Sequence, residues 1–147
     1  MARRTLGVVV GLAVWVLVVS VAGLVMRETW PSYARVADAM TFTLPMMMAR
    51  LAIGAGATLA MGLATAVVSR RSVGATLAAG ALLLLAFIPE HIRLWDKFPI
   101  WYHLTFLLSL VPLAYLGGLG TGVSRRVRPI SRGTKGDEVV GAIRNSG

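Results

Sequence analysis

Four long apolar runs constrain this sequence more than any other feature. A bilayer hydrocarbon core of about 30 Å requires roughly 20 apolar residues of helix, and each run is long enough to span it. None of the runs alternates as a strand would, and backbone groups in lipid must be satisfied within the segment. The sequence therefore predicts an all-α membrane protein with four transmembrane helices in an antiparallel bundle. The predicted spans, within a domain of residues 1–124, are about residues 6–26, 47–68, 73–92 and 100–119.

Composition also favours a membrane. Hydrophobic residues make up 56% of the chain and the mean hydropathy is +0.74, well above values typical of soluble domains. A net charge of +9 would indicate nucleic-acid binding only if the basic residues shared one face of a soluble domain. Here they flank the apolar runs, so no nucleic-acid partner is expected. The chain has no cysteine, which excludes disulfides and thiolate metal sites.

Basic clusters predict the orientation of the spans. They precede the first span, fill the turn between the second and third, and follow the fourth: Arg3 and Arg4; Arg70 and Arg71; Arg125, Arg126 and Arg128. All fall on one side, and cytoplasmic flanks are enriched in Lys and Arg. We therefore expect both termini in the cytoplasm, with the spans in a bacterial inner (plasma) membrane. The second and third clusters should bind anionic lipid headgroups.

The two ends of the chain differ in character. The first run could be a cleaved signal peptide, because Ser20 and Ala22 have the small-residue spacing of a cleavage site. The run is longer than a typical signal core of about 7–15 residues, which favours an uncleaved anchor. Residues 125–147 mix Gly, Ser, Pro and charge, and contain too few apolar residues to fold alone. They are predicted to form a basic, disordered cytoplasmic tail.

Small residues predict how the spans pack. Gly7 and Gly11 are expected to approach the face of the second span that carries Gly54, Thr58 and Gly62, because small residues allow close helix contact in lipid. In the third span, small residues lie toward the cytoplasm and leucines lie further out. Any cavity should therefore open on the outer side.

Depth counting places several polar side chains in one layer. Residues equidistant from a helical turn lie at similar heights, because each helix rises about 1.5 Å per residue. Counting from the turn after the second span places Arg50 and His91 at the same depth. Counting from the last loop places His91 and His103 at the same depth. We expect Arg50, Glu90, His91 and His103 to form a polar layer at the outer boundary of the hydrocarbon. If the layer is a ligand site, Arg50 would pair with Glu90.

Two interpretations of this layer stay open. In the first, tryptophan and tyrosine rings sit at headgroup level and the charged groups snorkel into water, as in an interfacial belt. In the second, the layer is a ligand site, whose candidate residues are Arg50, Glu90, His91, His103, Trp95, Trp101 and Tyr102. His91 and His103 are the candidate metal ligands, and a haem held between them is a further alternative. The expectation is nevertheless that the protein has no cofactor.

A short helix is predicted between the first two spans. Tyr33, Val36, Ala37 and Met40 recur at helical spacing, and Ser32 is a candidate cap. Such a helix would lie on the outer surface, with its apolar side toward lipid or over the polar layer. If it covers the layer, it is a lid.

The sequence predicts the class of function less sharply. No ionisable residue lies between the two polar boundaries, which argues against a pump or proton-coupled transporter. No phosphate loop or metalloprotease spacing is present, so an enzyme is not expected. The first expectation is a non-enzymatic accessory or scaffold component, with membrane lipids and another membrane protein or a second copy as partners. The alternatives are a binding protein for a small ligand, lipid, quinone or metal, and a membrane oxidoreductase component.

Overall fold

The computed structural model describes residues 1–123, and all regular structure in that range is helical. The helices are α1 (Ala2–Thr29), α2 (Pro31–Ala37), α3 (Leu44–Val68), α4 (Val73–Arg93) and α5 (Ile100–Val123). Of these, α1, α3, α4 and α5 are long and apolar enough to cross a membrane. The predicted architecture of four long helices and one short helix is confirmed, and it is consistent with a small integral membrane protein. The predicted tail, with Arg125, Arg126 and Arg128, lies outside the described residues.

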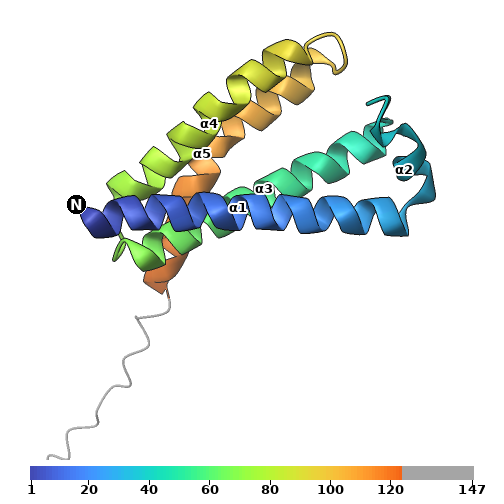
Figure 1. Ribbon diagram of the computed structural model, residues 1–147. Coiled ribbons are helices and arrows are strands. Elements are labelled where there is room, and N and C mark those ends of the chain that lie inside the picture. Colours follow the sequence, from blue (N-terminus) through green and yellow to red (C-terminus); the bar gives the residue numbers. More distant parts are fainter. Residues whose placement is uncertain (124–147) are drawn as a thin grey trace, which may run out of the picture.

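The four long helices form two pairs that diverge from each other. Helix α1 packs along α3, and α4 packs along α5. The pairs meet at the end where the chain begins and separate toward α2 and the α4–α5 loop (Figure 1). We call these the N-terminal end and the α2 end. The α3–α4 turn, which carries Arg70 and Arg71, lies at the N-terminal end, together with the start of α1 (Figure 1).

Glycines allow α3 and α5 to cross closely. A Cβ atom on Gly62 would clash with the Ala114 carbonyl oxygen of α5, and one on Gly117 would clash with the Leu59 carbonyl oxygen of α3. Each helix thus places a glycine against the backbone of the other. Lipid tails are as apolar as the helices, so no hydrophobic driving force brings the helices together. Close packing of this kind is therefore a principal source of their association.

The predicted partner face of α1 is wrong in part. Gly7 and Gly11 lie against Met61, Thr65 and Ser69 of α3. Gly54 and Gly62, which were expected to meet α1, face Phe106 and Ala114 of α5 instead. The reason is that α3 is apolar on every side, so its sequence does not specify which face meets which neighbour.

Of the three α3 residues that were expected to face α1, Thr58 does so. Trp15 of α1 donates a hydrogen bond from Nε1 to the Thr58 hydroxyl at 3.2 Å. The hydroxyl in turn donates to the Gly54 carbonyl oxygen at 2.7 Å. Both polar groups of this buried contact are therefore satisfied, as buried polar groups require.

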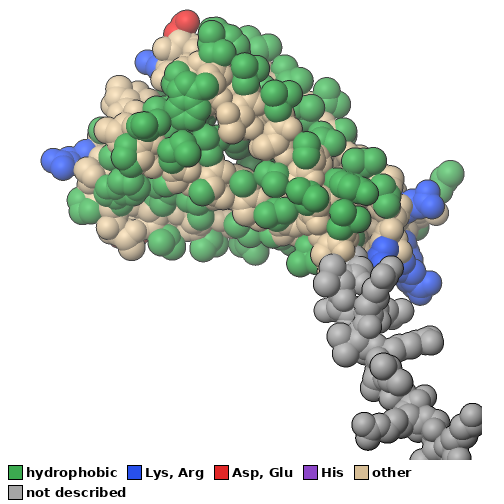
Figure 2. Space-filling model, turned by 180° about the vertical axis from the view of Figure 1, so that it is seen from behind, with side chains coloured by type: hydrophobic (Ala, Val, Ile, Leu, Met, Phe, Trp, Pro, Cys, Tyr) green, Lys and Arg blue, Asp and Glu red, His purple; other side chains and the backbone are tan. Residues whose placement is uncertain are grey.

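The outer surface of the bundle is apolar. In Figure 2 hydrophobic side chains cover most of the visible face, and Lys and Arg gather toward the two ends. Large aliphatic side chains such as Leu17, Leu85 and Leu108 are exposed on the described helices. This is the surface expected of helices that face lipid tails.

The short helix α2 begins two residues earlier than predicted. Pro31 is its first residue and Trp30 its cap, so the prediction that Ser32 caps the helix is wrong. Proline suits the first helical position because its missing N–H would have no helical partner there. Tyr33 and Ala37 point into the protein and pack with Met46 of α3. Helix α2 therefore covers the end of the bundle as a lid would.

Candidate ligand-binding site

A cavity of about 370 Å³ lies between the diverging helix pairs at the α2 end. This is the end at which the sequence predicts looser packing. Its deep part is lined by aromatic and aliphatic side chains, chiefly Trp15, Val19, Ile53, Phe87 and Phe106. Toward α2 it is lined by polar side chains, namely Tyr33, Arg50, Glu90, His91 and Tyr102. The cavity is therefore amphipathic along its length.

Arg50 forms the centre of the polar part. Its Nη1 donates to the Tyr33 hydroxyl at 2.8 Å, and its Nε points to the Tyr102 hydroxyl at 3.5 Å, a long contact. The guanidinium also lies over the ring of Phe42, with Cζ 4.7 Å from the ring centroid. Arg50 thus connects the lid helix, the loop that follows it, and α5.

The predicted pairing of Arg50 with Glu90 is wrong. Within residues 1–123 the ion pair that forms is Arg27 with Asp38, at 3.1 Å. Glu90 is an exposed residue at the cavity wall, whereas the two tyrosine hydroxyls hold the Arg50 side chain. Equal depth on two helices does not fix the direction of a side chain around each helix axis, which is why the depth argument fails here.

The structure brings His91 and His103 together, as the depth comparison predicts. Their Nδ1 atoms are 2.6 Å apart, and both rings are buried. A hydrogen bond between two imidazole Nδ1 atoms needs one N–H and one lone pair, so one ring donates and the other accepts. The indole of Trp95 stacks on His103, with centroids 4.9 Å apart and an interplanar angle of 13°.

This contact bears on the predicted metal and haem ligands. In the observed arrangement the two Nδ1 atoms hydrogen-bond to each other and do not converge on a third atom. Two Nδ1 atoms 2.6 Å apart are too close to bind one metal ion from opposite sides, which requires two bonds of ~2 Å each. In the part of the chain that the structure describes, no group of three or more His, Asp or Glu side chains is placed to hold a metal ion. In this arrangement His91 lines the cavity and contacts His103, which does not line it.

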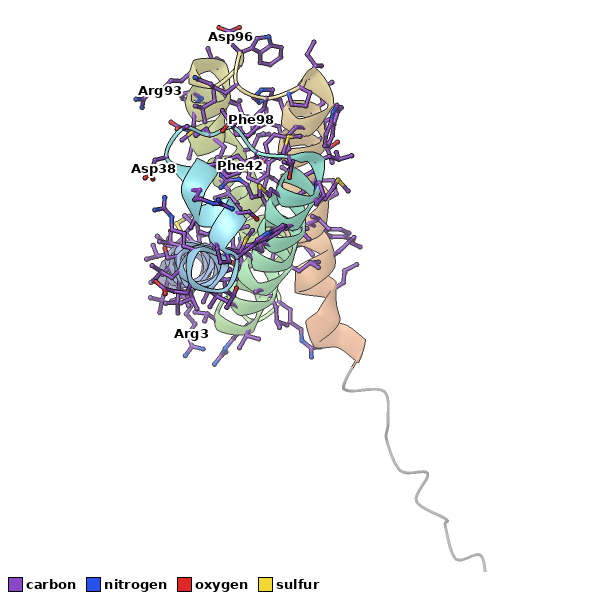
Figure 3. All side chains as sticks on the ribbon, turned by 90° about the vertical axis from the view of Figure 1, so that its right-hand side faces the viewer. Arg3, Asp38, Phe42, Arg93, Asp96 and Phe98 are labelled. Atoms are coloured by element: carbon purple, nitrogen blue, oxygen red, sulfur yellow. The ribbon has the colours of Figure 1, made fainter. Side chains whose placement is uncertain are left out.

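A ladder of stacked aromatic rings lies at the α2 end of the cavity. It runs from Tyr33 to Phe42, then to Phe98 and Tyr102, with successive centroids 5.1, 6.0 and 4.8 Å apart. Phe42 follows the lid helix and Phe98 belongs to the α4–α5 loop, so their contact joins the two helix pairs where they are furthest apart. Figure 3 looks onto this end and shows both rings between the pairs.

The other predicted aromatic residues divide between wall and surface. Tyr102 is buried and lines the cavity. Trp95 is half exposed and supports His103 from the outside. Trp101 is also exposed, and it touches the Tyr102 ring edge-on without lining the cavity. The interfacial-belt interpretation fits Trp101, whereas the ligand-site interpretation fits Tyr102.

Sequence reasoning missed Trp15, Tyr33, Phe42 and Phe98. Tyr33 is the one that sequence reasoning could most easily have found, because it lies on the apolar side of the predicted lid, above the predicted polar layer. Phe42 and Phe98 belong to connecting segments whose path depends on tertiary packing, and no periodic pattern marks them. Trp15 lies in the middle of an apolar run, where nothing distinguishes it from a lipid-facing residue.

Comparisons with known proteins add no relative. No protein-family model matches the chain, and no curated protein or solved structure matches it significantly.

Proposed function

We propose that this protein binds a small amphipathic molecule within the membrane, in the cavity at the α2 end. The observation that carries the proposal is the layout of that cavity, with one cation and two phenols above an aromatic and aliphatic floor. Small-molecule sites are mostly apolar, contain a few placed polar groups and have volumes of about 300–1,000 Å³. The cavity has this composition, and its volume of about 370 Å³ falls in this range.

The same layout favours ligand binding over the scaffold role that the sequence suggests first. A scaffold helix bundle gains from a filled interior, because unfilled volume forfeits packing energy. Here the two helix pairs separate and leave a cavity beside a buried polar cluster. An oxidoreductase role has less support, because the two histidines hydrogen-bond to each other.

The distribution of charge supports an orientation for the site. Arg3, Arg4, Arg70 and Arg71 lie at the N-terminal end without nearby acidic residues in the sequence. Basic flanks of this kind favour the cytoplasm. We therefore place the N-terminal end in the cytoplasm and the cavity near the outer face of what would be a bacterial inner membrane. A ligand would enter the site from the outer leaflet or the aqueous side beyond it.

Filling the cavity by mutation tests the proposal. Gly23 lines the cavity, and a Cβ atom added there meets nothing within 4 Å. Gly23→Leu should therefore occupy the cavity without disturbing α1, because leucine also favours helix more than glycine does. We expect native mass spectrometry of protein released in mild detergent to show a bound small molecule on the wild type and none on Gly23→Leu.

Gly56→Leu is the matched control. Gly56 is an exposed residue of α3 that also has open space around it, but it does not line the cavity. This variant should retain the ligand at wild-type occupancy. Equal occupancy in all three proteins, including no bound molecule in any of them, would contradict the proposed function.

A further inference from the structure

The charge of Arg50 is not balanced by a carboxylate. A guanidinium stays protonated under all ordinary conditions. Arg50 is part-buried between α2 and α5, where its guanidinium contacts two neutral phenols and a neutral ring. Among residues 1–123 it forms no ion pair. Arginine at membrane depth usually faces a partner of opposite charge, since an unpaired charge there is costly.

The groups around Arg50 present hydrogen-bond donors to the cavity. A guanidinium carries five N–H donors, and Arg50 uses two of them toward Tyr33 and Tyr102. Each phenol accepts from Arg50, so its own O–H remains able to donate. Both tyrosines are buried, at 4% and 5% exposure, and both line the cavity. Three side chains thus offer donors to one region, which is the chemistry that receives an anion.

The remaining charged or titratable groups of the cavity do not change this conclusion. Glu90 and His91 of α4 also line it. Glu90 is exposed and forms no ion pair with Arg50. The Nδ1 of His91 is engaged with His103. Arg50 is therefore the charged group that is both part-buried and facing the cavity.

The wall below Arg50 suits a hydrocarbon chain. On α1 the lining residues run from Met26 down to Trp15, a distance of about 16 Å along a helix that rises ~1.5 Å per residue. Phe87 and Phe106 also line the cavity, and their rings contact each other with centroids 5.1 Å apart. The volume of about 370 Å³ is small for a ligand site, which favours one chain over two.

We infer that the ligand is an amphiphile with one acyl-type chain and an anionic head, a carboxylate or a phosphate, held by Arg50, Tyr33 and Tyr102. The inference rests on the proposed function and specifies its ligand class. A carboxylate or phosphate can accept two parallel N–H bonds from one guanidinium, which a hydroxyl head cannot. A cationic head would meet Arg50 with like charge. The chain of the bound molecule lies against Trp15, Phe87 and Phe106.

Binding of head-group variants of one chain tests the inference. The full-length protein is placed in phosphatidylcholine nanodiscs, and the affinities of dodecanoate, dodecyl phosphate and dodecanol are measured. We expect at least one of the two anions to bind the wild type about tenfold or more tightly than dodecanol, the gain typical of a charge-assisted hydrogen bond. The preference should vanish in Arg50→Gln and persist in part in Arg50→Lys.

Control variants and a lipid arm complete the experiment. Arg35→Gln removes an exposed arginine of α2 that does not line the cavity, and it should bind as the wild type does. Displacement of dodecanoate by lysophosphatidylglycerol in the disc would identify a single-chain anionic phospholipid as the source of the head group. Failure of lysophosphatidylglycerol to displace it would identify a free single-chain anion. Both results uphold the inference.

Two results would overturn it in distinguishable ways. Equal affinity for dodecanol and both anions, or an anion preference that survives in Arg50→Gln, would contradict the anionic head while leaving amphiphile binding intact. Absence of binding by all three probes, with Gly23→Leu indistinguishable from the wild type, would contradict the proposed function itself.

Discussion

Leucine at Gly62 or Gly117 is expected to prevent α3 and α5 from packing. A Cβ atom at either position clashes with a backbone carbonyl of the other helix, at Ala114 or Leu59. Backbone atoms cannot rotate away as a flexible side chain can, so the helix axes would have to move apart. Even Gly62→Ala should lower the free energy of unfolding by about 1–3 kcal/mol, and leucine by more.

Thermal unfolding in detergent measures this effect. Gly56→Ala and Gly56→Leu are the controls, because position 56 is an exposed site on the same helix with open space around it. They should melt close to the wild type. Wild-type melting of both Gly62→Leu and Gly117→Leu would show that the α3–α5 crossing is not as close as described.

Removing the Phe42 ring is expected to detach the lid from the rest of the bundle. Phe42 stacks on Tyr33 and on Phe98, and it carries the guanidinium of Arg50 over its face. Each aromatic pair contributes about 0.5–1.5 kcal/mol and the cation–π contact about 0.5–2 kcal/mol. Phe42→Ala should therefore weaken the attachment of the lid by roughly 1.5–5 kcal/mol, the sum of these contacts.

Hydrogen–deuterium exchange reports the loosened segment. In Phe42→Ala the amide hydrogens of the non-proline residues within 31–37 and 94–99 should exchange faster, while those of the α3–α5 crossing should not change. Leu44→Ala, which alters an exposed neighbour two residues further along, serves as the control. If exchange in residues 31–37 stays at the wild-type rate, the ladder does not hold the lid.

The sequence predicts the parts of this fold that depend on hydropathy and helix length. Long apolar runs fix the four spans to within a few residues of α1, α3, α4 and α5, because the bilayer sets how long a spanning helix must be. A constant rise per residue then sets depth, which is why counting along the hairpins places His91 and His103, which the structure brings into contact, at one height.

Direction around the helix axis is what the sequence does not supply. Helices that are apolar on all sides carry no stripe that marks the buried face. For this reason the prediction of which face of α3 meets Gly7 and Gly11 is wrong in part, and the predicted Arg50–Glu90 pair is wrong. In the structure Arg50 contacts Tyr33 and Phe42. Both residues belong to the segment that connects the first two spans, and they reach Arg50 only because this segment folds as the lid.

Photochemical mapping of a bound amphiphile tests most directly whether the cavity is a ligand site. A dodecanoate with a diazirine in its chain is photolysed with the protein in phosphatidylcholine vesicles, and the modified residues are identified by peptide mass spectrometry. We predict adducts on cavity residues such as Trp15, Val19 and Phe87, removed by excess unlabelled dodecanoate. Adducts confined to exposed residues such as Leu17, Leu85 and Leu108, and insensitive to the competitor, would contradict the account.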